Sequence, residues 1–93
     1  MDLARFQGLM RETYGDRDQA RGVEATVAWL AEEVGELARA VRKGGSRERL
    51  HELGDVLAWL ASLADQLGLE LAEAADSYAS GCPRCGSRPC ACP

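Results

Sequence analysis

The chain contains very few of the residues that favour β-strands. Its 93 residues include no isoleucine, two threonines and five valines, against 15 alanines and 12 leucines. Because alanine and leucine are strong helix formers and β-branched residues are not, this composition predicts an all-α fold. The stretches without a charged side chain are too short to cross a membrane. The first five residues lack the basic-then-apolar order of a signal peptide, which predicts a cytoplasmic protein.

Basic residues are also fewer than acidic ones. The chain has 11 basic and 15 acidic residues and a net charge of −4. All the acids lie within residues 1–80, where the balance is −6, and Arg84 and Arg88 follow in a tail that has no acid. Such a body should repel nucleic acids and anionic membranes, so we expect neither as a partner. A phosphorylated ligand would need divalent cations to mediate its contact with the protein.

Glycines and polar stretches divide the chain into four expected helices. We predict helices at about residues 2–13, 23–43, 46–67 and 69–80, with a polar loop at residues 14–22. Asp2 and Ser46 suit the N-cap position, where a side-chain oxygen accepts backbone N–H groups. The helical body is predicted to span residues 1–80 as one domain, followed by a cysteine-rich tail at residues 81–93.

The second and third predicted helices each carry an apolar stripe at heptad-like spacing. The stripes consist of Val27, Leu30, Val34, Leu37 and Val41, and of Leu50, Leu53, Leu57, Leu60, Ala64 and Leu67. A two-residue link between the helices predicts an antiparallel hairpin with these stripes as its seam. Because so small a chain buries a thin core, we expect a homodimer or homotetramer that completes a four-helix bundle core. A self-contained monomeric bundle is the alternative.

Acidic residues recur at helical spacing on these same two helices. The motifs are Glu32-Glu33-x-x-Glu36 and Glu52-x-x-Asp55. Spacings of three and four place side chains on one helix face, so an antiparallel hairpin could bring the two motifs together. Clustered carboxylates repel one another, and a hard cation such as Mg²⁺ or Mn²⁺ offsets that repulsion. The alternative is an ordinary solvated acidic face.

Two tryptophans lie one helical turn from these acids. Trp29 precedes Glu33 by four residues, and Trp59 follows Asp55 by four. Both lie away from the apolar stripes, so something should cover them. A partner helix could do so, and so could a stacking ligand such as a nucleobase.

Together these motifs resemble those of MazG-like all-α nucleoside triphosphate pyrophosphohydrolases. The resemblance rests on Trp29-Leu30-Ala31-Glu32-Glu33-Val34-Gly35-Glu36-Leu37 and on Glu52-Leu53-Gly54-Asp55-Val56-Leu57. It implies hydrolysis of a nucleoside triphosphate to the monophosphate and pyrophosphate, with housecleaning of non-canonical nucleotides as the role of that reaction. It also implies Mg²⁺ held by Glu33, Glu36, Glu52 and Asp55, with Glu32 in a supporting catalytic role.

Other functions remain alternatives to this one. A phosphoribosyl-ATP pyrophosphohydrolase belongs to the same superfamily, and a non-catalytic helical dimerisation module with a zinc knuckle belongs to a different class. The last predicted helix lacks Lys, Arg and Asn, so basic contacts to phosphates are expected from Arg17, Arg21 or Lys43. The single histidine, His51, is expected to lie at the surface.

All four cysteines lie in the tail. Cys82, Cys85, Cys90 and Cys92 form a Cys-x-x-Cys turn followed by Cys-x-Cys. Four thiolates within so few residues can supply a tetrahedral Zn²⁺ site, which predicts a structural zinc ion. Disulfides or a redox pair are the alternatives, and a reducing compartment disfavours stable disulfides.

Overall fold

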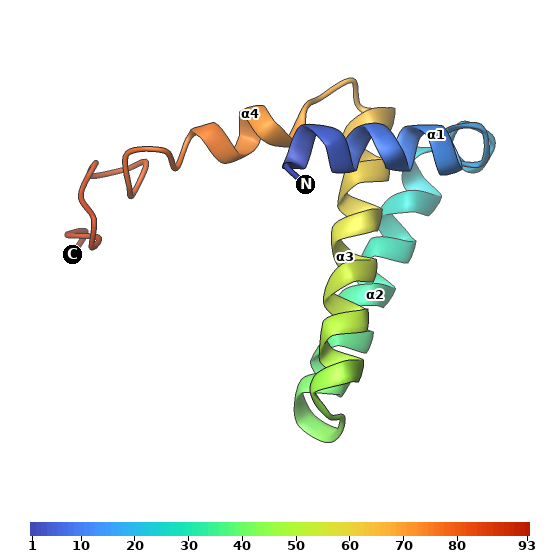
Figure 1. Cartoon of the computed structure of the whole chain (residues 1–93), viewed down its shortest axis with the longest axis horizontal. Coiled ribbons are helices and arrows are strands. Elements are labelled where there is room, and N and C mark those ends of the chain that lie inside the picture. Colours follow the sequence, from blue (N-terminus) through green and yellow to red (C-terminus); the bar gives the residue numbers. More distant parts are fainter.

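A computed structural model describes all residues, 1–93, and contains four α-helices and no strand, which confirms the all-α prediction (Figure 1). The helices are α1 (Leu3–Arg21), α2 (Val23–Lys43), α3 (Ser46–Gln66) and α4 (Leu71–Asp76). Helices α2 and α3 form the expected antiparallel hairpin, and α1 crosses its open end (Figure 1). Helix α4 and the tail extend away from the hairpin. None of the helices is both long and apolar enough to span a bilayer.

Helix α1 is longer than the sequence predicts. The polar segment at residues 14–22 was expected to be a loop, but α1 continues through it to Arg21. Polar contacts stabilise this last part, since Asp18 is buried and forms an ion pair of 2.8 Å with Arg21, three residues further along the same helix. The side-chain amide of Gln66 also donates a hydrogen bond to the Asp18 carbonyl oxygen. A polar sequence is thus helical here because its polar groups find partners on a neighbouring helix.

Glycine makes the junction between α1 and α2 a single residue long. Gly22 has φ +88° and ψ 162°, a conformation that is essentially restricted to glycine.

The Ser46 cap prediction is wrong: Ser46 is the first helical residue of α3, and Gly45 occupies the N-cap without a side-chain bond. The hairpin is closed instead by Arg49, whose guanidinium donates hydrogen bonds to the carbonyl oxygens of Ala40 and Val41 at the end of α2.

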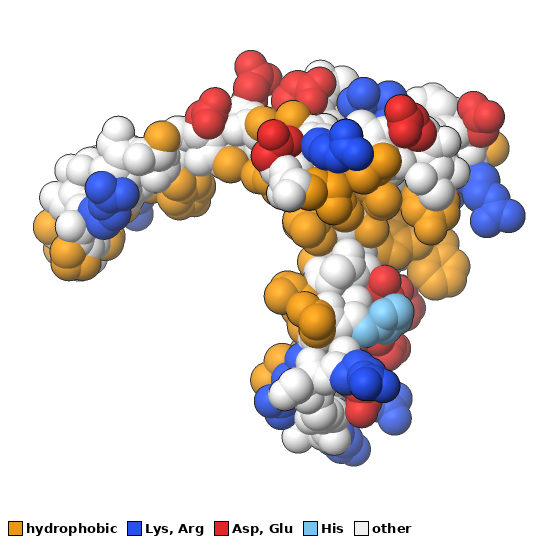
Figure 2. All heavy atoms as spheres, in the orientation of Figure 1, with side chains coloured by type: hydrophobic (Ala, Val, Ile, Leu, Met, Phe, Trp, Pro, Cys, Tyr) orange, Lys and Arg blue, Asp and Glu red, His pale blue; other side chains and the backbone are white.

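The predicted Leu and Val seam is largely wrong. Most of its members stay exposed, from 38% for Leu57 and Leu60 to 73% for Leu50, while Leu30 and Leu37 are half-buried and Ala64 is buried. The buried residues of α2 are Thr26 and Ala40, and the half-buried Leu30, Glu33 and Leu37 lie between them on the same face. The hairpin interior is therefore lined mainly by small residues, and most of the large apolar side chains of the stripes lie outside it. Figure 2 shows hydrophobic side chains along one side of the hairpin and charged side chains of both signs along the other.

Helix α4 is shorter than the predicted helix at residues 69–80. The fully buried side chain of Gln7 binds the segment before it, donating to the Leu69 carbonyl and accepting from the Leu71 N–H at 2.8 Å each. These bonds hold the chain extended until α4 begins. After Asp76 the backbone continues in hydrogen-bonded turns rather than in an α-helix.

Candidate functional site

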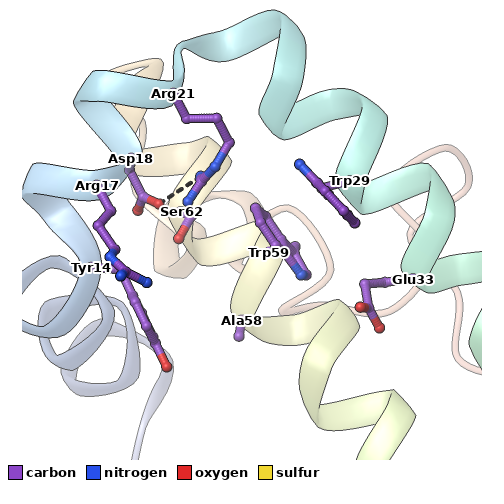
Figure 3. Close-up of a pocket in the computed structure, with 9 residues that line it drawn as sticks. All are labelled: Tyr14, Arg17, Asp18, Arg21, Trp29, Glu33, Ala58, Trp59 and Ser62. Carbon is purple, nitrogen blue, oxygen red and sulfur yellow. Dashed lines mark hydrogen bonds and ion pairs between the residues drawn. The ribbon is translucent and has the colours of Figure 1, made fainter.

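A cavity of about 430 Å³ opens where α1 crosses the hairpin (Figure 3). Its lining comes from all three long helices: Tyr14, Arg17, Asp18, Arg21, Trp29, Glu33, Ala58, Trp59 and Ser62. One wall is aromatic, one is basic, and a carboxylate lies at the edge. A cavity with this mixture of apolar surface and a few converging polar groups is typical of a small-molecule site.

The two tryptophans stack on each other inside this cavity. The ring centroids of Trp29 and Trp59 lie 6.1 Å apart with an interplanar angle of 13°. The guanidinium of Arg21 lies 4.7 Å from the Trp59 ring centroid, so Trp59 contacts both a ring and a cation. Trp29 remains 51% exposed. The intramolecular stack explains how two tryptophans can lie off the apolar stripes, and it leaves Trp29 surface accessible to a ligand.

Arg21 is held in place by two further contacts. Its Nη1 donates to the Asp18 carboxylate at 2.8 Å and to the Thr26 hydroxyl at 3.2 Å. Thr26 in turn donates to the Gly22 carbonyl oxygen. The cation beside Trp59 is therefore fixed by groups from both sides of the α1–α2 junction.

Glu33 brings unneutralised negative charge to the cavity. Its Oε2 atom is buried and has no hydrogen-bond partner. Burial raises the pKa of Glu33 above its ordinary value, and the nearby charges of Asp55, Glu52 and Glu36 raise that pKa further. An acceptor that is desolvated and surrounded by other acids needs a cation for its ionised form to be stable.

The second acidic motif lies next to Glu33 on α3. Glu52, Asp55 and His51 can direct one ligand atom each to within 4.8 Å of one another. His51 is exposed, as expected, and its Nε2 lies 3.3 Å from the Asp55 Oδ2. No arginine or lysine forms an ion pair with Glu33, Glu52 or Asp55.

Glu36 lines a second cavity of about 350 Å³ toward the closed end of the hairpin. The lining is Glu36, Arg39, Ala40, Lys43, Gly44, Glu48 and Glu52. Lys43, one of the predicted phosphate contacts, thus lies in a cavity with two of the predicted metal ligands. Glu32 is exposed and lines neither cavity.

Of the four predicted metal ligands, Glu52 and Asp55 lie within reach of one ion together with His51, whereas Glu33 and Glu36 fall outside that set. Carboxylate oxygens suit Mg²⁺ or Mn²⁺, and the orphaned Oε2 of Glu33 is an observation that a nearby cation would explain. Sequence reasoning did not find Tyr14, Asp18, Ala58 or Ser62 in the cavity lining. The first two fall in the segment expected to be a loop, and the other two carry no motif. The four cysteine sulfurs lie within 4.8 Å of one another in the tail, apart from this cavity.

Comparison with known proteins agrees with this geometry. Residues 21–81 match the MazG nucleotide pyrophosphohydrolase domain, which covers the whole hairpin and α4. The chain belongs to the MazG nucleotide pyrophosphohydrolase family. A relative from Bacillus subtilis (strain 168), named "Uncharacterized protein YvdC", is 39% identical over 88 residues, covering 76% of this chain and 83% of its own length.

The MazG match includes only some of the residues that line the cavity. It begins at Arg21 and so includes both acidic motifs and both tryptophans. Tyr14, Arg17 and Asp18 lie before it, on α1. This MazG chain therefore assembles the cavity from the matched hairpin and from a helix that the match does not include.

Proposed function

We propose that this MazG chain hydrolyses a nucleoside triphosphate to the nucleoside monophosphate and pyrophosphate, with Mg²⁺ or Mn²⁺ as cofactor. The observation that carries the proposal is the buried, unpartnered carboxylate oxygen of Glu33 beside a cavity walled by two stacked tryptophans. A cation site suits the triphosphate of a nucleotide, and the aromatic surface next to it suits the base. In the reaction water adds to phosphorus, the bond between the α and β phosphates breaks, and pyrophosphate leaves.

The metal-binding residues in this proposal are Glu33, Glu36, Glu52 and Asp55. When bound, Mg²⁺ would supply positive charge that neutralises the triphosphate oxygens, which an acidic protein could not otherwise accept. Glu52 and Asp55 are already within ligand reach of each other, and both raise the pKa of Glu33 by their charge. Glu32, which is exposed on α2, is assigned the supporting catalytic role.

The nucleobase would stack against the exposed surface of Trp29. Stacking on an aromatic side chain contributes about 1–3 kcal/mol per base and tolerates any base. Trp59 stacks against Trp29 and is itself in cation–π contact with Arg21. Arg17 lines the same cavity and Lys43 the second one, so either could contact phosphate oxygens.

A second copy of the chain is the proposed partner, in a homodimer or homotetramer. The only buried hydrophobic residues are Ala40, Ala61 and Ala64, a very small core for 93 residues. Leu50, Leu53 and Val34 on the stripes of α3 and α2 are at least half exposed, and Figure 2 shows hydrophobic side chains along one face of the hairpin. A two-fold axis would pair this face with itself into a four-helix core. Sedimentation of the wild type and of Leu53→Glu tests this: a wild-type monomer contradicts the proposal.

Pyrophosphate release from a panel of nucleoside triphosphates and phosphoribosyl-ATP, with and without Mg²⁺, tests the activity. We expect release only with the metal, and its loss in Glu36→Ala and Asp55→Ala. Glu24→Gln, an exposed acid on the same helix as Glu36, is the matched control and should retain activity. A wild-type chain that releases no pyrophosphate with any of these substrates would favour the non-catalytic dimerisation module.

A further inference from the structure

The tail brings four sulfur atoms to one point. The Sγ atoms of Cys82, Cys85, Cys90 and Cys92 all lie within 4.8 Å of one another, and those of Cys82 and Cys92 are 3.6 Å apart. The cluster lies beyond α4 and away from the hairpin (Figure 1). Neither of the cavities that could serve the nucleotide includes a tail residue. The cluster therefore needs an explanation of its own.

Backbone hydrogen bonds hold the first cysteine pair in a tight turn. The Gly86 N–H donates to the Cys82 carbonyl oxygen, and the Cys82 N–H donates to the Ser87 carbonyl oxygen at 3.0 Å. Gly86 has φ +71°, which a residue with a side chain rarely adopts. Gly81 has φ +113°, and a Cβ there would lie 2.7 Å from the Ser87 carbonyl oxygen. Two glycines thus allow the turn to close.

Backbone amides point at the sulfur atoms themselves. The Ala91 N–H donates to the Cys85 Sγ at 3.3 Å, and the Cys92 N–H donates to the Cys90 Sγ at 3.4 Å. Hydrogen bonds of this kind stabilise the negative charge of a thiolate ligand and fix its direction. They are made by the backbone, so they follow from the fold of the tail and not from the choice of neighbouring side chains.

We propose that the four cysteines bind one structural Zn²⁺ ion. With Zn–S bonds of about 2.3 Å, a tetrahedral site has sulfur atoms about 3.8 Å apart. The 3.6 Å between Cys82 and Cys92 matches that edge, and all six sulfur pairs fall below 4.8 Å. This proposal does not depend on the nucleotide site.

Charge and geometry favour zinc over disulfides. A disulfide brings two sulfurs to about 2.05 Å, whereas here all four cysteines are free and their sulfurs gather around one centre. Four thiolates and Zn²⁺ carry a net charge of −2. The only charged side chains after residue 80 are Arg84 and Arg88, which balance that charge.

The ion would order the tail and leave the hairpin unaffected. The tail has no helix or strand and buries no residue fully, so it has little else to stabilise it. Loss of the metal should therefore expose residues after Gly81 to proteolysis without altering the cavity between α1 and the hairpin. The ion's role is thus separable from that of Mg²⁺.

Metal analysis of full-length protein, purified with reductant and without chelator, tests the site. We expect one Zn²⁺ per chain, and intense visible absorption from thiolate coordination when Co²⁺ replaces it. Cys82→Ser and Cys90→Ser should lose most of the metal, and Ser87→Ala, a change at a neighbouring side chain without a ligand atom, should keep it. Protease should cut the tail only in the cysteine variants.

Three outcomes would overturn the proposal. One is wild-type protein that contains no zinc, takes up none when it is added, and has four freely titratable thiols. Another is two disulfides found by mass spectrometry in protein kept under the same reductant. The third is undiminished zinc in the double variant Cys82→Ser/Cys90→Ser, which would locate the ion at the carboxylates instead.

Discussion

The guanidinium of Arg21 lies 4.7 Å from the centroid of the Trp59 ring while it forms an ion pair with the buried carboxylate of Asp18. One side chain thus links the end of α1 to the aromatic wall on α3. The Asp18 side chain is 3% exposed and its Oδ2 has no partner, so Arg21 supplies nearly all of its neutralisation. These contacts contribute to the fold itself, because they fix the position of Trp59 without a ligand.

Removal of Arg21 should therefore destabilise the fold. Arg21→Ala leaves a buried carboxylate unpaired, and we expect a loss of about 2 kcal/mol in the free energy of unfolding, measured in urea. Arg17→Ala, which removes an exposed guanidinium without an ion pair, is the control and should change little. Asp18→Asn in the Arg21→Ala background should recover much of the loss. Equal stability of Arg21→Ala and wild type would contradict this account.

Trp29 should contribute to substrate binding more than to stability. It is half exposed, whereas Trp59 is contacted by both Trp29 and Arg21. Trp29→Ala should raise KM about tenfold while kcat and the melting temperature change little. Trp29→Phe should recover part of the affinity. An unchanged KM with a large drop in melting temperature would mean that Trp29 serves packing alone.

The raised pKa of Glu33 predicts how stability depends on pH without Mg²⁺. The folded state holds this proton to a higher pH than the unfolded state, whose ordinary value is 4.5. Stability should thus fall as pH rises from 4.5 to the folded pKa, because the folded state binds more protons across that interval. Glu33→Gln removes this cost, so its melting temperature should exceed that of wild type at pH 7.

The gain in stability from Glu33→Gln should disappear in acid, where the Glu33 carboxyl is protonated in both the folded and the unfolded state. Added Mg²⁺ should stabilise wild type at pH 7 and have less effect on the variant. Glu24→Gln, at an exposed position in the first turn of α2, should show no such pattern. A variant less stable than wild type at pH 7 without metal would refute the electrostatic explanation.

Gly22 should tolerate no side chain. Nothing lies within 4 Å of a Cβ built there, so any cost comes from its backbone conformation at φ +88°. Gly22→Ala should reduce the free energy of unfolding by about 1–3 kcal/mol. Gly8→Ala offers a matched control, because Gly8 is helical and also has open space, and alanine there should stabilise by about 0.5–1 kcal/mol. Thermal unfolding of both variants tests the pair.

The sequence predicted the hairpin well because its signals are local. Glycines mark the ends of α2 and α3, and the acidic spacing places Glu33 near Glu52 and Asp55. The seam could not be predicted in the same way. Periodicity says which residues share a helix face but not which face meets the neighbouring helix, and here the inward face of α2 carries Thr26, Glu33 and Ala40.

The prediction of where α1 ends was wrong for a different reason. Its last part is polar, and polar stretches between apolar ones usually form loops. Its helical structure depends on partners that are distant in sequence, such as Gln66, which is 48 residues from Asp18. Tyr14 and Asp18 could enter the predicted cavity only once that contact was known.

Helix geometry also gives the candidate site a fixed length. Trp29 and Glu33 are four residues apart, as are Asp55 and Trp59, which corresponds to a rise of about 6 Å on each helix. Because α2 and α3 are antiparallel, both tryptophans lie on the same side of the acids. No loop intervenes that could lengthen or shorten this interval. In the proposed nucleotide complex, this fixed interval would select for the distance between the ring and the charged groups of the ligand, and base identity need not enter into that selection.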